Sequence, residues 1–283
     1  MTTEGERGGP RIPRLGIDQL WTAFEAIDLL GVLSDELTGA AWDGAGRCRL
    51  TPEDGGPGNG DPGKDVVLED LHAGISRLLP VPVLRAFRAA AVTTLVARRL
   101  LVPGVVLGGV LGAGLAAQVH IAVLARFLPD VSHVTVCTCT GLPSTRILPR
   151  LLDQLDLSGI GLSVTDDARE AVLGANLVVA PPGGGGFAGI GLPARGAVLV
   201  NSSGHALAAE VAGRVDQVYV DDPARTARHE YRDAVVAGLG ELITAHGLRR
   251  RADDILLAEL AGADVLDVRL AWEVHRTALE RSR

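Results

Sequence analysis

The sequence is short of cysteine, lysine and net positive charge, and each shortage excludes a class of protein. A net charge of −7 leaves no basic excess to neutralise nucleic-acid phosphates or an anionic membrane surface. Three cysteines without CxxC or Cys/His spacing predict neither a zinc site nor a framework of several disulfides. Lys64 is the only lysine among 27 basic residues, so lysine chemistry has a single candidate. We therefore expect no nucleic-acid partner, no metal and a reducing, cytoplasmic location.

Residues 100–125 contain no Asp, Glu, Lys or Arg, which a membrane span would also show. Pro103 and five glycines interrupt this stretch, so we interpret it as a turn between two elements. The first residues, MTTEGERGGPRIPR, lack the apolar core of a signal peptide. No membrane partner is expected.

The middle of the chain has the pattern of a parallel sheet. A helix is predicted over residues 17–33, a Gly- and Pro-rich loop over 53–65, and a second helix over 83–101. Short Val- and Leu-rich runs then alternate with helical stretches, at residues 104–111, 133–139, 160–165, 176–180, 196–201 and 217–220. Continuous apolar strands separated by helices are typical of a sheet covered on both faces. We therefore predict a doubly wound α/β domain over residues 102–222.

Helical patterns return after this domain, at residues 226–247 and 264–281. These helices can complete the first segment of the chain. The predicted organisation is therefore one domain formed by residues 1–101 and 223–283, with residues 102–222 inserted between its halves.

The strongest chemical signal is a glycine turn between a predicted strand and a predicted helix. Residues 112–117 match the pattern GxGxxA. Gly112 permits a tight turn, Gly114 lets the backbone approach a diphosphate, and Ala117 lets the helix lie close to the strand. The phosphates would meet free N–H groups at the positive end of the helix. We expect dinucleotide binding by Gly112, Ala113, Gly114, Leu115, Ala116 and Ala117; a turn that serves packing alone is the alternative.

The strand predicted after this helix ends where the adenosine ribose of a bound dinucleotide would lie. NAD sites often place an acid there to bond the 2′-hydroxyl, whereas this chain has Thr138, Cys139 and Thr140. Neutral side chains tolerate a 2′-phosphate, and Arg146 could reach it. The pattern therefore favours NADP(H) over NAD(H), although both remain open. A third alternative is that this pocket no longer binds either cofactor.

Six blocks of the sequence resemble the ornithine cyclodeaminase and mu-crystallin family. They are LRAFRAAAVTTLVARRL, LGAGLAAQVH, AREAVLGANLVVA, VLVNSSG, DQVYVDD and ADDILLAELAGADVLDVRLAW, and they span most of the chain from Val83 onward. The resemblance implies a Rossmann-type parallel sheet inserted into a smaller α+β substrate and dimerisation domain. It also implies a homodimer.

The resemblance assigns roles to several residues. Arg88 matches an arginine that receives the substrate carboxylate, for which a planar guanidinium is suited. Val179, Ala180 and Pro181 match the strand end beside the cofactor, and Asn201 and Ser202 match the loop under the nicotinamide. Asp267 matches an acid of the closing helix, where a structural cap is an equal alternative.

This chain also departs from the pattern of the cyclodeaminating members. They use a lysine and a glutamate from an early sheet, and an aspartate just after the loop NxxG. Here His205 and Ala206 follow that loop, and Lys64 is the sole lysine. His205 could act as a general acid or base, because its unperturbed pKa lies near neutrality.

These features predict an NAD(P)-dependent oxidoreductase of specialised metabolism that acts on the C–N bond of a small amino acid or cyclic imine. Its substrate would carry a carboxylate. Two alternatives stay open: a non-catalytic NADP(H)-binding protein similar to mu-crystallin, and a deaminating lyase with a rebuilt active site.

Overall fold

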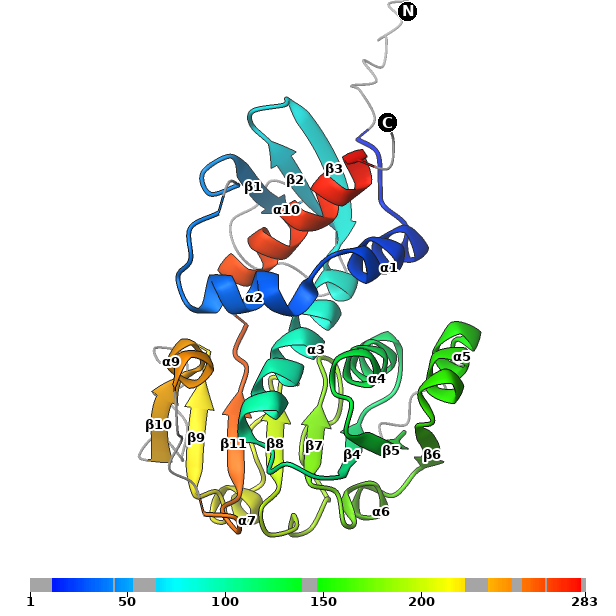
Figure 1. Cartoon of the computed structure of the whole chain (residues 1–283), viewed down its shortest axis with the longest axis vertical. Helices are drawn as coiled ribbons and strands as arrows, with labels where there is room; N and C mark the ends of the chain where they lie inside the picture. The colour runs from blue at the N-terminus through cyan, green and yellow to red at the C-terminus, as the bar shows by residue number, and fades with distance from the viewer. Residues whose placement is uncertain are drawn as a thin grey trace, which may run out of the picture.

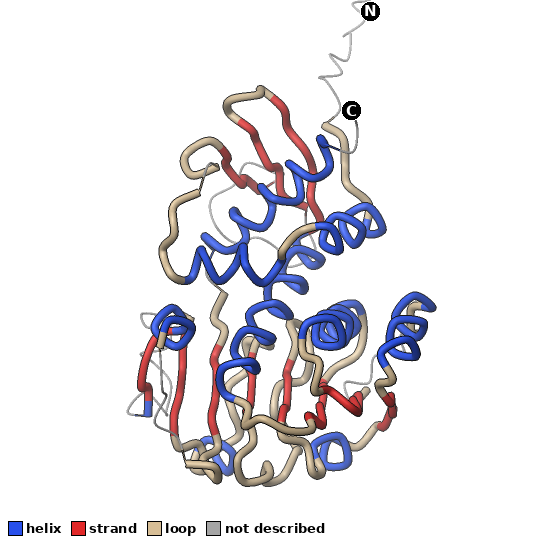
Figure 2. The backbone as a smooth tube through the Cα atoms, in the orientation of Figure 1, coloured by secondary structure: helices blue, strands red, loops and turns tan. Residues whose placement is uncertain are grey.

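The computed structural model describes residues 12–42, 44–52, 65–138, 147–221, 234–245, 251–262 and 264–280. They form a large unit around an eight-stranded sheet and a smaller unit around a three-stranded sheet (Figure 1). A long helix, α3 (Val81–Leu100), runs from the smaller unit onto the larger one (Figures 1 and 2).

The large sheet is parallel throughout and has the order β10-β9-β11-β8-β7-β4-β5-β6. Its strands are β4 (Val106–Leu111), β5 (Val131–Cys137), β6 (Gly161–Thr165), β7 (Leu177–Ala180), β8 (Val198–Asn201), β9 (Gln217–Val220), β10 (Val235–Gly238) and β11 (Leu256–Glu259). From β4 the chain proceeds outward to β5 and β6, and then returns to the other side of β4 at β7. The strand order therefore reverses between β4 and β7, which is where ligands bind in open sheets of this kind.

Apolar side chains cover both faces of this sheet. In β7, Leu177 and Val179 belong to one buried cluster, whereas Val178 and Ala180 belong to another. The helices of the first face are α3, α4 (Leu115–Phe127), α5 (Pro149–Ser158) and α9 (Leu239–Thr244); those of the second are α6 (Ala168–Val172) and α7 (Ala209–Ala212). The predicted doubly wound α/β sheet is confirmed, because its strands are buried from both sides.

The smaller unit joins both ends of the described chain. Its antiparallel sheet is β1 (Cys48–Pro52), β2 (Asp65–Asp70) and β3 (Ile75–Pro80), and its helices are α1 (Ile17–Ala26), α2 (Leu29–Leu37) and α10 (Asp264–Glu280). The last helix, α10, contacts α1, α2, α3 and β1. The predicted mixture of helices and strands in this unit is therefore present.

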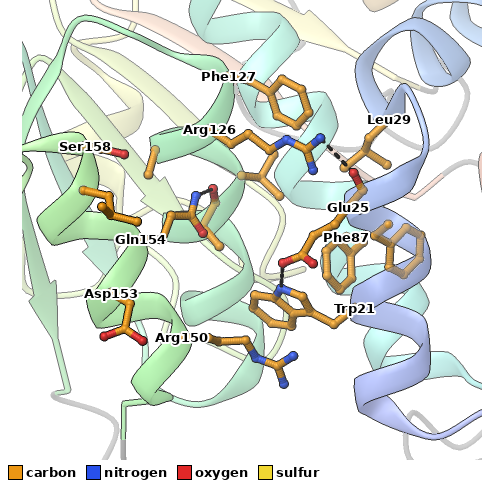
Figure 3. Close-up of a pocket in the computed structure, with 15 residues that line it drawn as sticks. Trp21, Glu25, Leu29, Phe87, Arg126, Phe127, Arg150, Asp153, Gln154 and Ser158 are labelled. Atoms are coloured by element: carbon orange, nitrogen blue, oxygen red, sulfur yellow. Dashed lines mark hydrogen bonds between the residues drawn. The ribbon is translucent and has the colours of Figure 1, made fainter.

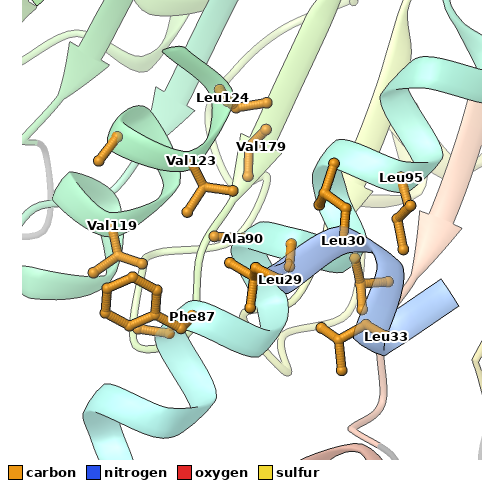
Figure 4. Close-up of a cluster of buried hydrophobic side chains, with 14 of the residues drawn as sticks. Leu29, Leu30, Leu33, Phe87, Ala90, Leu95, Val119, Val123, Leu124 and Val179 are labelled. Atoms are coloured by element: carbon orange, nitrogen blue, oxygen red, sulfur yellow. The ribbon is translucent and has the colours of Figure 1, made fainter. Parts of the chain in front are cut away.

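One buried cluster connects the two units. It brings Leu29, Leu30 and Leu33 of α2 together with residues of α3, α4 and β7 (Figure 4). Phe24 and Phe87 stack at 3.9 Å between ring centroids within the same cluster. The two units therefore share a core.

Three expectations about secondary structure need correction. The helix predicted over residues 17–33 divides into α1 and α2, because Asp28 accepts a hydrogen bond from the Gly31 amide and caps a new helix. The helix predicted over residues 226–247 contains strand β10 before the short helix α9. A further strand, β11, lies between β8 and β9, so residues after 222 supply two strands to the large sheet.

The apolar stretch at residues 100–125 folds as the end of α3, strand β4 and most of α4. Within the described part of the chain, no helix combines the length and the apolar character needed to cross a membrane.

Candidate cofactor and substrate site

A cavity of about 560 Å³ opens at the carboxyl ends of the central strands. The turns after β4, β7, β8 and β11 line it, and the first turns of α3 close it from the smaller unit. It lies at the point where the strand order reverses, and its volume is within the range of about 300 to 1,000 Å³ typical of small-molecule sites.

The glycine turn lies in the wall of this cavity. Gly114, with φ of +91°, is the N-cap of α4. The Gly112 amide donates to the Cys137 carbonyl at 3.0 Å, which ties the turn to β5. A Cβ on Gly112 would lie 3.1 Å from the Cα of Gly184, because the turn after β7 packs against it. Glycine is therefore needed at both positions, one for backbone conformation and one for close approach.

The backbone amides of this turn are available to a ligand. The first amide of the region bound within α4 is that of Gln118, which donates to the Gly114 carbonyl at 3.2 Å. Among the described residues, none accepts a hydrogen bond from the amides of 113–117. Ala113, Leu115 and Ala116 line the cavity. These amides can therefore bind an anion at the positive end of the helix.

The loop after β8 is held by its own side chains. Asn201 is fully buried; its Oδ1 accepts from the Ser203 amide at 3.2 Å and from the Ser203 hydroxyl at 2.8 Å. The Ser202 hydroxyl and amide both donate to the Ala180 carbonyl at 2.9 Å. This network fixes the turn 202–204, which lines the cavity beside the glycine turn.

A buried acid lies behind this loop. Glu259, at the end of β11, is 5% exposed, and both of its carboxylate oxygens lie 3.0 Å from Asn201 Nδ2. Glu259 was not among the predicted site residues, because no strand was predicted at its position. A charged residue at the carboxyl end of the apolar run 255–258 was the available signal.

Arg88 lines the cavity and is paired with an acid. Its Nη1 donates to Asp267 Oδ2 at 3.0 Å, and Arg85 lies one turn earlier on α3 with its Nε 4.0 Å from the same oxygen. A Cβ on Gly262 would come within 2.9 Å of Arg88 Nη2, so the loop after β11 packs on this guanidinium. Asp221 holds that loop by accepting from the Ala261 and Gly262 amides at 2.8 and 2.9 Å.

The other predicted site residues lie at varying distances from the cavity. Val179 and Ala180 are fully buried in β7, and it is Pro182 and Gly183 after them that line the cavity. His205 is exposed, with its Cβ beside Gly186, and is absent from the described lining residues. The Thr138 hydroxyl donates to the Thr165 carbonyl at 3.3 Å, and the preceding residue, Cys137, is buried and disulfide-bonded. The other residues predicted near the ribose, Cys139, Thr140 and Arg146, lie outside the described residues.

A larger cavity, of about 680 Å³, lies elsewhere, between α1, α3, α4 and α5 (Figure 3). Aromatic side chains line it, and several of its polar groups bind one another: Trp21 Nε1 donates to Glu25 at 3.0 Å, and Arg126 donates to the Glu25 carbonyl at 2.8 Å. The Arg150 guanidinium lies 4.5 Å above the Trp21 ring. We place the candidate site at the glycine turn, because the cavity there combines available amides with convergent polar side chains. The described residues contain no cluster of metal ligands.

No protein-family model and no curated protein matches the chain in sequence. Solved structures match it in fold. The alignment with the crystal structure of CmnK covers 96% of this chain and 96% of the CmnK chain, with a TM-score of 0.69 and 21% identity. Thermococcus litoralis Δ1-pyrroline-2-carboxylate reductase, solved with NADH and L-proline, covers 96% and 98%, with a TM-score of 0.70 and 14% identity. A probable ornithine cyclodeaminase from Bordetella pertussis covers 96% and 98%, with a TM-score of 0.64 and 18% identity. The resemblance predicted from the sequence is therefore confirmed as a shared fold.

Proposed function

We propose that this protein is an NAD(P)-dependent oxidoreductase acting on the C–N bond of a small amino acid or cyclic imine. The observation that carries the proposal is the set of available amides at residues 113–117, a turn from which Ala113, Leu115 and Ala116 line the same cavity as Arg88. The Thermococcus litoralis reductase, which has the same fold, was solved with NADH and L-proline, and this supports the proposal.

The structure fits a dinucleotide, because Gly114, the N-cap of α4, places no side chain over the amides that begin this helix. A bound nicotinamide would supply or accept a hydride at the substrate carbon. The chain's own part is to hold the diphosphate on the amides and to support the nicotinamide with the turn 202–204. Arg88 would bind and orient the substrate carboxylate.

Asn201 and Ser202 would contribute to cofactor binding by holding the turn 202–204 that supports the nicotinamide. Asn201, bonded to Glu259 and Ser203, keeps the turn 202–204 in place. His205 remains our candidate for proton transfer, although it would have to act from outside the described cavity lining. Thr138, Cys139 and Thr140 remain our candidates for the ribose end, where we propose a preference for NADP(H). We also propose that the protein is a cytoplasmic homodimer: its few cysteines suit a reducing compartment, and its resemblance to the family implies the dimer.

The first test compares two glycines. We expect Gly114→Ala to weaken NADPH and NADH binding by about tenfold or more, because a Cβ there narrows the approach to the amides. Gly174→Ala is the control: Gly174 also has positive φ, +74°, but nothing lies within 4 Å of an added Cβ. The measurement is nicotinamide fluorescence on titration, with thermal melts of both variants. The proposal fails if the wild-type protein binds neither cofactor, or if both variants bind as wild type does.

His205 and Ala206 follow the loop where the family has its aspartate, and Lys64 is the sole lysine; both features favour a second candidate, a non-catalytic NADP(H)-binding protein. Turnover separates the two. The enzyme should oxidise NADPH with some member of a panel of imines, or of 2-oxo acids with ammonia, whereas the binding protein would bind NADPH without consuming it. A lyase with a rebuilt site would instead release ammonia without net cofactor consumption.

A further inference from the structure

The substrate end of the cavity carries an excess of positive charge. Arg85 and Arg88 both line it, and the described lining residues include no acidic side chain. The remaining described wall is made of small, apolar or hydroxyl side chains. The adjacent N-terminus of α4 adds a positive partial charge. This cationic end contrasts with the net charge of −7 of the whole chain.

The two arginines share one carboxylate unequally. Asp267 is 3.0 Å from Arg88, whose side chain is 12% exposed, but 4.0 Å from Arg85, whose side chain is 41% exposed. Arg88 is therefore held in a close pair and packed under Gly262, while Arg85 extends into the cavity with only a distant ion pair. The Asp267 carboxylate is already paired closely with Arg88 and lies 4.0 Å from Arg85, so a positive charge remains at Arg85 in the cavity.

We propose that Arg85 binds a second acidic group of the substrate, so that the cavity takes a short dicarboxylic amino, imino or 2-oxo acid. This inference rests on the proposed function, in which Arg88 binds the first carboxylate. The spacing supports it, because residues three apart on a helix face the same side and present two guanidinium groups to one ligand. A guanidinium is well matched to a carboxylate in geometry and charge.

The same charges disfavour a diamino acid. A second ammonium group would lie near Arg85, and no described lining residue has an acidic side chain to neutralise it. Like charges placed close together in a partly desolvated cavity repel each other. The cavity therefore selects for a negative rather than a positive substrate side chain.

The test titrates succinate and butyrate, a dicarboxylate and a monocarboxylate of equal length, into the protein with and without saturating NADPH. Binding is measured by calorimetry for wild type, Arg85→Ala and Arg98→Ala. Arg98 lies exposed near the C-terminal end of the same helix and is the matched control. We expect wild type and Arg98→Ala to bind succinate about tenfold tighter than butyrate, because a charge-assisted hydrogen bond is lost with the second carboxylate. In Arg85→Ala this preference should disappear, while NADPH affinity stays unchanged.

Three results would overturn the inference. Equal weakening of both acids in Arg85→Ala would mean that both arginines bind a single carboxylate. An unchanged preference for succinate would remove Arg85 from the site, and a loss of NADPH affinity would assign Arg85 to the cofactor phosphates. Failure of the proposed function would look different: wild type would bind neither NADPH nor NADH, and the titrations without cofactor would still decide the role of Arg85.

Discussion

His120 is a titratable side chain buried completely in the core. It lies on α4, where its Nδ1 is 2.8 Å from the Ala116 carbonyl, and burial lowers its pKa from 6.5 to about 4. Between pH 6.5 and about pH 4, His120 is therefore protonated in the unfolded chain but neutral in the folded protein. Folding stability consequently falls as the pH drops from 6.5 towards 4.

We expect this single residue to remove about 2 kcal/mol of unfolding free energy between pH 7.5 and pH 5. The measurement is urea unfolding at both pH values for wild type and His120→Gln. The pH-dependent loss should be smaller in the variant by that amount, whatever its stability at pH 7.5. His72→Gln, at an exposed position, is the control and should keep the wild-type loss. An equal loss in wild type and His120→Gln would contradict the assigned pKa.

Single residues also mark how far the site could be predicted from the sequence. Gly112 and Gly114 were found because their role depends on local backbone geometry, which a short motif records. The pair of Arg88 with Asp267 joins residues 179 positions apart, and the bond from Asn201 to Glu259 joins residues 58 positions apart. Such pairs depend on the fold, so no local pattern reveals them.

Strand prediction succeeded where a strand was an uninterrupted apolar run. β7 and β8 are four residues long, and all four are buried in each. β10 was missed because all of its residues are only partly buried or exposed, so it lacks that apolar pattern. β11 was missed because its four residues precede a long helical pattern that dominates the segment. Short strands such as β10 and β11 can therefore be recognised only from their pairing in the sheet, not from the sequence pattern.

The packing of β4 on α6 gives a test at this scale. A Cβ on Gly109 would lie 2.5 Å from the Ala171 carbonyl oxygen, whereas a Cβ on neighbouring Gly108 would lie 3.5 Å from the Val134 side chain. Gly109→Ala should therefore lower the unfolding free energy by about 2 kcal/mol or more, because the α6 backbone must move. Gly108→Ala, the matched control, should change it by less than about 1 kcal/mol. Chemical denaturation measures both, and equal effects would show that α6 does not pack tightly on β4.

At the scale of the whole molecule, the two units share one hydrophobic core. The same buried cluster contains Leu20 and Leu68 of the smaller unit and Val110, Val200 and Leu256 of the sheet. The candidate site follows this arrangement, because α3 supplies its arginines and the sheet supplies its turns. Separating the units would expose this core and divide the site.

We therefore expect the chain to unfold in a single cooperative transition. The three tryptophans, Trp21, Trp42 and Trp272, all belong to the smaller unit, so their fluorescence reports mainly on it and, through the contact of Trp21 with Arg150, on its interface with α5. Far-UV circular dichroism reports on both units. The two signals should give the same midpoint.

NADPH at 100 times its Kd should then raise the unfolding free energy measured by both signals by about 2.7 kcal/mol, even though its proposed diphosphate contacts lie in the larger unit. Gly114→Ala should lose this shift in both signals. The contrary result would be that NADPH raises the midpoint measured by circular dichroism but not the midpoint measured by tryptophan fluorescence. The two units would then unfold independently despite their common core.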